Sequence, residues 1–251
     1  TADTTLKAST GRALRFPTVG ELYGATATVN SQYINDPDLK PEKSWTSELT
    51  AEKDLGNAVL RFTLFTENTR DSLYSQVTFD PAANSNIGRV QNVGRIKTNG
   101  LEVAFNGTDL LAASLGKGLG FSGSVTYADS RIKENSGFVA VPGDTVGKYQ
   151  PRVPVWRATG LVSYRFAPAW TGTFAARYSG KQFSSLDNTD VNGFAYMGTS
   201  KYFVTDVRVH YRVNRQWTAA VGIDNLNNYQ YWNFHPYPQR SYFAKLKADF
   251  C

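Results

Sequence analysis

Two histidines are the side chains in this 251-residue chain best suited to acid–base chemistry. His210 lies in the segment FVTDVRVHYRV, where an extended chain places it on the same side as Asp206, Arg208 and Arg212. An aspartate and a histidine around a water molecule could activate that water for hydrolysis. Because two arginines accompany one acid beside His210, we expect it to form part of a hydrated wall rather than to act as a base.

Other catalytic motifs do not occur in the sequence. We find no GxSxG, no phosphate-binding loop, no glycine-rich dinucleotide fingerprint and no HExxH. Two histidines and a single cysteine, Cys251, offer too few ligands for a protein-built transition-metal centre. The sequence therefore predicts a protein that is not an enzyme and needs no cofactor.

Aromatic residues gather in one segment near the end of the chain, YQYWNFHPYPQR at 229 to 240. Aromatic faces and a guanidinium group suit a flat anionic ligand, such as a catecholate-type ferric chelate, through stacking and charge-assisted hydrogen bonds. A dense aromatic segment can equally pack on itself, and both interpretations stay open. The candidate ligand-binding residues here are Tyr229, Tyr231, Trp232, Phe234, His235, Tyr237 and Arg240.

Two further segments carry candidate binding residues. The stretch from 183 to 203 contributes Phe183 and Tyr196, and the segment after the first extended stretch contributes Arg15 and Phe16. We expect all three segments to be loops, which commonly carry binding residues on a rigid scaffold.

The elements that must position these loops are strands. Apolar and polar residues alternate with period two about ten times, which predicts an all-β protein without a convincing helix. The expected strands are 4 to 11, 44 to 54, 58 to 70, 99 to 107, 121 to 130, 155 to 166, 170 to 179, 203 to 213, 217 to 226 and 240 to 250.

The connections alternate in length. Those at 55 to 57, 166 to 169 and 213 to 216 are short, that at 108 to 118 is intermediate, and the remainder, such as 71 to 93, are long. Outer-membrane barrels have short periplasmic turns and long extracellular loops. Strands of about ten residues with aromatics at the ends of their apolar faces also fit a tilted crossing of a bilayer. We therefore predict an antiparallel transmembrane β-barrel in the lipid bilayer; a soluble β-sandwich is the alternative.

Charge and hydropathy exclude other classes. The net charge of +6 is spread along the chain, so we expect no nucleic-acid partner. No apolar run approaches the roughly 18 residues of a membrane-spanning helix, and no signal-peptide pattern opens the sequence. The predicted inward rows carry more basic than acidic groups, which would attract anions or simply keep a water-filled lumen wet. The inward basic residues are Lys7, Arg61, Arg157, Arg165, Arg177, Arg208, Arg212, Lys245 and Lys247.

The last predicted strand, SYFAKLKADF, places Phe250 on its outward row. Outer-membrane proteins resemble one another in a C-terminal aromatic that the barrel assembly machinery is thought to read, so that machinery is an expected partner. Cys251 extends past the row. We interpret it as an added residue, with a native tail residue as the alternative, and assign 1 to 250 to the barrel.

Several motifs in order resemble the barrel of TonB-dependent outer-membrane receptors. They are LKASTGRALRFPTVGELYG, NDPDLKPEKSWTSELTAE, NVGRIKTNGLEVAFNG, VGIDNLNNYQYW and the closing SYFAKLKADF. Family members have an N-terminal plug domain and about 22 strands, so the resemblance implies that this chain is the C-terminal portion of a larger plugged barrel, without the plug and early strands.

The resemblance also implies a function. It is energy-coupled uptake of a scarce ligand, most simply a ferric siderophore, across the outer membrane of a Gram-negative bacterium. An inner-membrane energy-coupling complex would act through the missing plug. A passive porin-like channel and a ten-stranded outer-membrane protease remain the alternatives.

Overall fold

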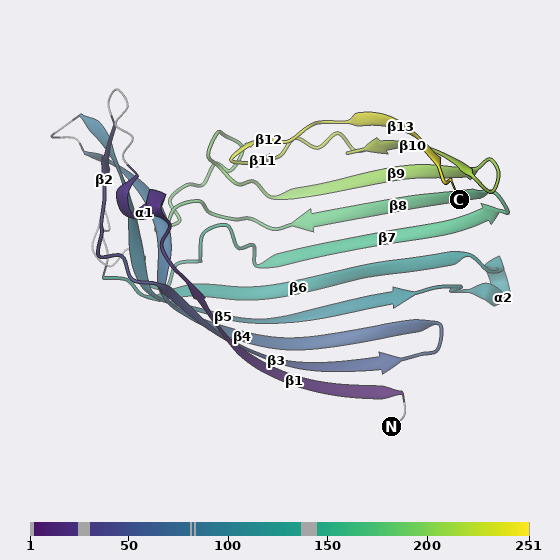
Figure 1. Ribbon diagram of the computed structural model, residues 1–251, viewed down its shortest axis with the longest axis horizontal. Coiled ribbons are helices and arrows are strands. Elements are labelled where there is room, and N and C mark those ends of the chain that lie inside the picture. The colour runs from purple at the N-terminus through teal and green to yellow at the C-terminus, as the bar shows by residue number, and fades with distance from the viewer. Residues whose placement is uncertain (1–2, 25–30, 81, 83, 137–144, 251) are drawn as a thin grey trace.

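A computed structural model of the chain describes residues 3–24, 31–80, 82, 84–136 and 145–250. One large sheet dominates it, and along the main path every strand pairs antiparallel with the next (Figure 1). The path consists of β1 (Thr4–Arg15), β3 (Glu42–Asp54), β4 (Ala58–Asp80), β5 (Ser85–Gly107), β6 (Leu119–Glu134), β7 (Trp156–Ala167), β8 (Trp170–Ser179), β9 (Tyr202–Arg212), β10 (Trp217–Asp224) and β13 (Ser241–Ala248). These ten strands confirm the predicted fold class. The residue interpreted as an addition, Cys251, lies outside the described residues.

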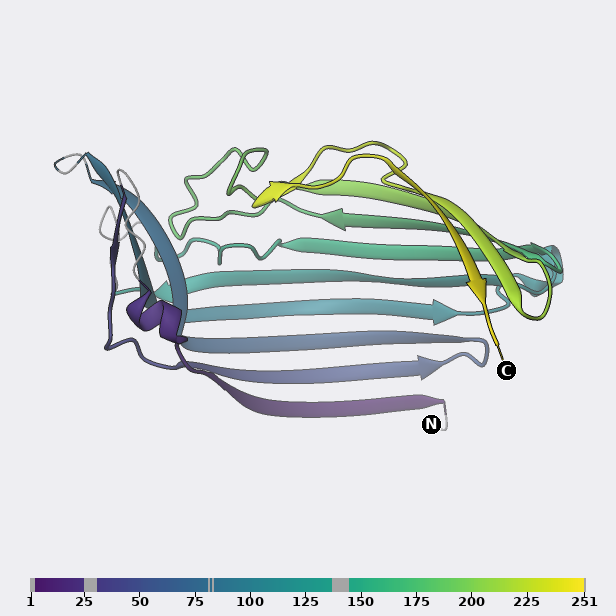
Figure 2. The same cartoon turned by 45° about the horizontal axis from the view of Figure 1, so that its top comes forward.

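The strands lie side by side along the long axis of a curved sheet, with the short turns together at one end and most long connections at the other (Figure 2). Within the described residues, β1 and β13 each pair on one side only, so the sheet is not closed. Both features match part of a barrel wall rather than a complete barrel.

The two faces of the sheet differ as the alternation predicts. On β9, Val207 and Val209 share one face with Phe174 of β8 and Val221 of β10, their register partners. Large apolar side chains on this face remain exposed, among them Phe174, Phe203 and Val221. A soluble sandwich would bury such a face against a second sheet. A barrel in a membrane has this polarity, because its outer surface is apolar and contacts lipid.

Long connections contain more regular structure than the sequence pattern indicates. Residues 71 to 93, expected to be a loop, extend β4 and β5 into a hairpin that is paired as far as Asp80 and Ser85. The connection from 12 to 43 contains the end of β1, the short helix α1 (Val19–Tyr23) and β2 (Ser31–Ile34), which pairs parallel with β5. The loop interpretation of 71 to 93 is wrong because backbone pairing with a neighbour stabilises a strand whose own alternation is weak.

One of the motifs that resemble the receptor family has a packing role in the structure. In NDPDLKPE, Leu39 is buried, and the Lys40 backbone N–H donates to Asn92 Oδ1 at 2.8 Å. Glu42 accepts hydrogen bonds from Ser72 Oγ and from the backbone N–H of Leu73. The motif thus fixes the start of β3 against β4 and β5.

Helices are short. Besides α1, the described part of the chain contains α2 (Ala112–Leu115) in the β5–β6 connection. No described helix is both long enough and apolar enough to span a membrane.

Candidate functional site

The segment 229 to 240 folds into a small hairpin at the long-connection end of the sheet. It contains β11 (Trp232–Asn233) and β12 (His235–Pro236). Backbone hydrogen bonds attach it to the 183–203 segment: the Ser200 N–H donates to the Trp232 carbonyl at 3.0 Å, and the Phe234 N–H donates to the Gly198 carbonyl at 2.9 Å. Two segments that the sequence treats as separate loops therefore form one unit, which we call the aromatic hairpin unit (residues 183–203 and 229–240).

Part of this unit presents aromatic rings to solvent. The Tyr196 ring, 69% exposed, meets Trp232 edge-on at 5.1 Å and His235 at 5.9 Å between centroids. Phe234 and His235 are also in edge contact at 4.7 Å, and both are exposed. Four of the predicted site residues are therefore brought together from two segments.

Tyr231 has a different environment. It is only 8% exposed, stacks on Tyr237 at 4.7 Å and contacts Tyr202 at 4.8 Å. Burial raises the pKa of the Tyr231 hydroxyl above its ordinary value. Self-packing, one of the two interpretations of this loop, therefore describes Tyr231, while the exposed rings are free to meet a ligand.

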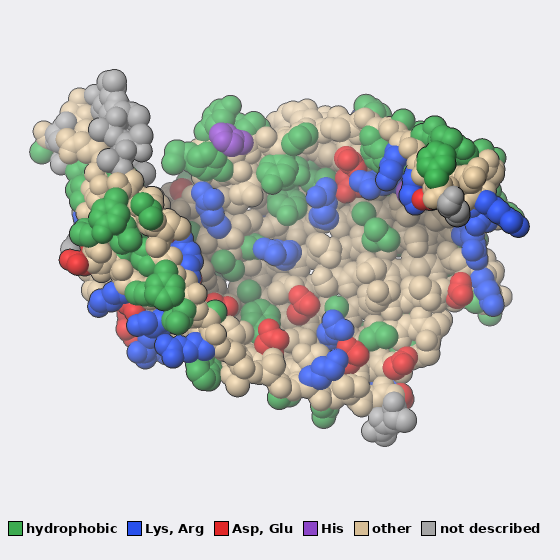
Figure 3. Space-filling view, viewed as in Figure 1, with side chains coloured by type: hydrophobic (Ala, Val, Ile, Leu, Met, Phe, Trp, Pro, Cys, Tyr) green, Lys and Arg blue, Asp and Glu red, His purple; other side chains and the backbone are tan. Residues whose placement is uncertain are grey.

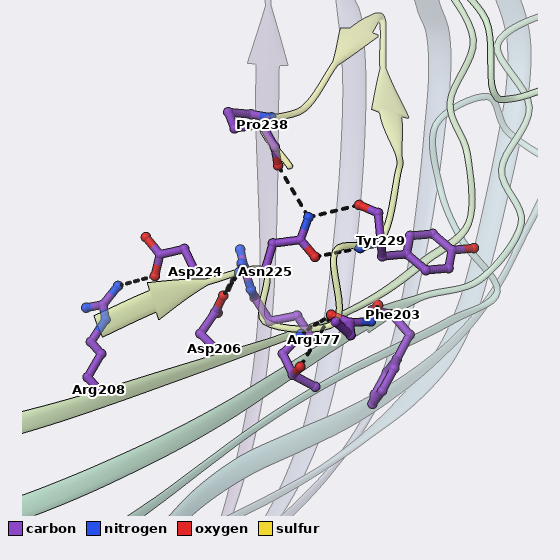
Figure 4. A network of polar contacts seen from close by, with 10 residues as sticks. Arg177, Phe203, Asp206, Arg208, Asp224, Asn225, Tyr229 and Pro238 are labelled. Atoms are coloured by element: carbon purple, nitrogen blue, oxygen red, sulfur yellow. Dashed lines mark hydrogen bonds and ion pairs between the residues drawn. The ribbon is translucent and has the colours of Figure 1, made fainter. Parts of the chain in front are cut away.

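Asn225 holds the base of the hairpin (Figure 4). Its side-chain oxygen accepts from the Tyr229 N–H at 2.8 Å, and its amide nitrogen donates to the Tyr229 and Pro238 carbonyls at 2.9 and 3.4 Å. The Asn225 N–H donates to Asp206, which also pairs with Arg177 at 3.1 Å. Asparagine tolerates the left-handed backbone that this turn requires, φ 53° at Asn225.

Arg240 is bound into the same turn. Its Nε and Nη2 donate to the Leu226 carbonyl at 3.0 and 2.7 Å, and its backbone N–H donates to Asn228 Oδ1. The side chain has further N–H groups, but in this arrangement the guanidinium secures the end of the hairpin.

Cationic groups border the aromatic hairpin unit. Phe183 is stacked parallel to Tyr149 at 6.4 Å, and the Lys181 ammonium lies 4.6 Å from the Phe183 ring centre. The Arg152 guanidinium lies 6.0 Å from the Phe234 ring. Positive charge beside exposed rings suits an anionic, aromatic ligand.

Arg15 and Phe16 lie elsewhere, where β1 leads into α1 (Figure 1). Arg15 pairs with Glu21 at 2.6 Å, and Glu21 completes a capping box with Thr18. Burial acts to raise the pKa of Glu21, but hydrogen bonds from Thr18 and Arg15 outweigh it and leave that pKa below its ordinary value. Phe16 is exposed. Arg15 thus pairs with the glutamate that caps α1, and the exposed Phe16 ring is accessible to a ligand.

The possible acid–base pair does not form. Asp206 and His210 are four residues apart on β9, about 13 Å along an extended strand. Asp206 is held by Arg177 and the Asn225 N–H, whereas His210 lies opposite Thr171 and Ala220 in the register. The two side chains therefore do not face each other around one water molecule.

The predicted inward rows do share one face. Figure 3 shows Lys, Arg, Asp and Glu side chains mixed over the face in view. A recess of about 830 Å³ is lined by Glu52, Arg61, Glu102 and Arg177, among others. Glu52 pairs with Arg61 at 2.8 Å and with Lys7 at 3.8 Å, so much of the charge on this face is compensated locally.

Sequence reasoning missed Tyr149, Tyr202 and Asn225. Tyr149 stands in a predicted loop without an aromatic cluster, and Tyr202 lies inside the 183–203 segment without being one of its candidate binding residues. The DNLNN run in the VGIDNLNNYQYW motif is the sequence signal for Asn225, since asparagines favour turns that need a left-handed residue.

Comparisons with known proteins support the architecture. Residues 1–226 match the family model described as TonB dependent receptor-like, beta-barrel. The probable TonB-dependent siderophore receptor PiuA of Acinetobacter baumannii is 27% identical over 212 residues, which are 81% of this chain and 26% of that protein.

Solved structures agree on the fold. The crystal structure of PiuA from Acinetobacter baumannii covers 97% of this chain, with 32% of its own length, 23% identity and a TM-score of 0.67. A variant of the ferric enterobactin receptor PfeA from Pseudomonas aeruginosa, in complex with enterobactin, covers the whole chain with 39% of its own length, 20% identity and a TM-score of 0.69. The copper transporter OprC covers 98% with 37% of its length, 19% identity and a TM-score of 0.71. The chain thus spans about a quarter to two fifths of the relatives it matches.

Proposed function

Because this chain belongs to the family of TonB-dependent receptor-like β-barrels, we propose that it forms the C-terminal part of the barrel of an outer-membrane receptor that imports a ferric siderophore. The family implies a protein of the Gram-negative outer membrane. Energy for import would come from an inner-membrane complex that acts through a plug domain outside this chain, and the barrel assembly machinery would recognise the last strand.

The proposed ligand is based on the aromatic rings of the aromatic hairpin unit. The rings of Tyr196, Phe234 and His235 are exposed, that of Trp232 is half-buried, and the four converge at the long-connection end of the sheet with Arg152 beside Phe234. Lys181 lies beside Phe183 of the same unit. Rings that stack and cations that attract would bind a flat, negatively charged ferric catecholate in water. The similarity to PiuA and PfeA, whose names and structure titles refer to siderophores, points in the same direction.

Copper, the cargo named for OprC, fits the residues less well. Soft thioether and thiolate ligands favour copper(I), yet the chain has one methionine and one cysteine. Its two histidines, His210 and His235, lie in the sheet and in the hairpin respectively. We therefore keep a ferric siderophore as the proposed cargo.

The test uses the full-length receptor in planar bilayers and in a binding assay. We expect very low conductance, because a plug fills the barrel, and saturable quenching of intrinsic fluorescence by a ferric catecholate. A large, steady conductance would instead identify a porin-like channel. Cleavage of a dibasic peptide that is lost in His210→Ala would establish the protease alternative.

A further inference from the structure

The β5–β6 connection, residues 108 to 118, is the longest connection at the short-turn end of the sheet, and it folds toward one particular face. A Cβ atom built on Gly107 would lie 2.9 Å from Leu110 Cδ2 and 3.1 Å from the Phe105 ring. The Tyr164 hydroxyl of β7 donates a hydrogen bond to the Leu115 carbonyl at 3.1 Å. Leu110 therefore packs over Gly107 in the neighbourhood of Phe105, and the Leu115 carbonyl contacts the Tyr164 side chain.

Those side chains belong to the apolar face. Phe105 alternates with the charged and polar row of Glu102 and Asn106, and Tyr164 is two residues from both Val162 and Phe166 on its strand. Val162 pairs with Phe121 on one side and Phe174 on the other. The contacts of Leu110 and Leu115 therefore lie on the outer face of the sheet, whereas Thr108, at the start of the connection, lines the recess with Glu52 and Arg61.

Within the connection, two leucines are exposed. Leu111 is 64% exposed and Leu115 is 48% exposed. Backbone hydrogen bonds from Ser114 and Leu115 to the Leu111 carbonyl close one turn, with Leu111 as the left-handed N-cap of α2. Ala113 and Leu115 are two residues apart in α2, about 200° around the helix axis, so Ala113 points away from Leu115. Lys117, exposed, follows directly.

The connection is held in this arrangement by its own hydrogen bonds. Asp109 Oδ1 accepts from the Gly118 N–H at 2.7 Å, and the Leu110 N–H donates to the Leu119 carbonyl at 2.9 Å. Leu111 has a φ of 54°, which is rare for a leucine and persists only where the surrounding structure holds the backbone. Gly118, with a φ of 114°, is at a position that suits glycine. The exposed leucines are therefore presented by an ordered segment.

An aromatic band marks the level of this segment. Phe166 stacks on Trp170 at 6.4 Å, and Trp170 stacks on Tyr211 at 4.3 Å, all near the short-turn ends of β7, β8 and β9. Tyr164, which holds the Leu115 carbonyl, is two residues from Phe166. Barrels place such bands at the boundary between acyl chains and headgroups.

We propose that the β5–β6 connection is an interfacial membrane anchor, with Leu111 and Leu115 inserted at the acyl-chain boundary of the periplasmic leaflet and Lys117 beside lipid phosphates. A short ordered segment with two exposed leucines and a lysine at its edge has the chemistry of interfacial binding. The segment is continuous with the outer apolar face and the aromatic band, so we assign lipid as the molecule that it contacts. This inference rests on the outer-membrane location in the proposed function.

The test measures the depth of single spin labels. The full-length receptor, with Cys251→Ser, is reconstituted in phosphatidylethanolamine–phosphatidylglycerol liposomes with a nitroxide at Leu111→Cys, Leu115→Cys or Ala113→Cys. Relaxation by oxygen and by a water-soluble nickel chelate is compared. We expect the oxygen-to-nickel accessibility ratio at 111 and 115 to exceed that at 113 by at least about threefold, because oxygen concentrates in the bilayer.

Two results would overturn the anchor. Equal, nickel-dominated accessibility at all three positions places the connection in water, and exclusion of both reagents at 111 and 115 shows a protein contact. A label at Val162→Cys, on the outer face, reports whether the barrel has inserted. Siderophore binding is measured on the same samples, so a receptor that inserts but binds no siderophore refutes the proposed cargo without affecting the anchor result.

Discussion

At the scale of single residues, Asn225 determines the shape of the candidate site. It is only 4% exposed and bonds three backbone groups of the hairpin with one side chain. Replacing it with alanine removes these three hydrogen bonds, each of which contributes about 0.5–1.5 kcal/mol. We expect Asn225→Ala to increase hydrogen–deuterium exchange in residues 226 to 240 while β9 stays protected. Asn233→Ala, at an exposed asparagine of the same hairpin, is the matched control; equal exchange in the two variants would contradict this role.

The aromatic residues should divide into two functional groups. Tyr196 and Phe234 are exposed, so the Tyr196→Ala/Phe234→Ala variant should weaken ferric-catecholate binding by at least about tenfold, because two lost stacking contacts of about 1 kcal/mol each exceed the 1.4 kcal/mol of a decade. Hydrogen exchange of the hairpin should stay unchanged. Tyr231→Ala should instead raise that exchange, since it removes a buried stack. Unaltered affinity in the double variant would assign recognition to other loops or to the plug.

Glu21 makes the α1 segment sensitive to acid. Its pKa is lower in the folded protein than in the unfolded chain, so its contribution to stability is complete above the ordinary glutamate pKa and is lost as the pH falls through the lowered value. A spin label at Val19→Cys, an exposed position of α1, should therefore be more mobile in acid than at neutral pH. In Glu21→Gln the label should show no such acid transition; a transition that persists there would come from another group.

At the scale of elements, close strand pairing depends on glycine at one central position. A Cβ at Gly100 would overlap the Phe65 ring and the Tyr127 carbonyl oxygen, and the carbonyl belongs to a paired backbone that cannot move aside. We expect Gly100→Ala to lower the temperature at which the folded, faster-migrating band of the full-length receptor disappears on electrophoresis. Gly160→Ala is the control, because its new methyl group would meet only Phe121, at 3.8 Å. Identical transition temperatures would show that β5 adjusts.

At the scale of the whole molecule, the sheet has two strands paired on one side only, β1 and β13, within the part that the structure describes. In a bilayer every unpaired backbone group costs several kcal/mol, so an open sheet is not a stable spanning structure. We expect the 251-residue chain by itself to show a β-rich circular dichroism spectrum in detergent but no heat-modifiable band, whereas the full-length receptor shows one. A heat-modifiable band from the chain alone would mean that β1 and β13 close on each other.

The sequence by itself determined the ten-stranded antiparallel sheet, the exposed apolar face and the sorting of short and long connections. Alternation is local information, because consecutive side chains of a strand point to opposite faces whatever the neighbours are. The extension of β4 and β5 through residues 71 to 93 depended instead on pairing between distant backbones. Likewise, only the tertiary structure decided that Tyr196 meets Trp232, that Tyr231 is buried and that Arg240 holds a turn. Loop side chains acquire their partners from segments far away in the sequence, and no local pattern records which segments those are.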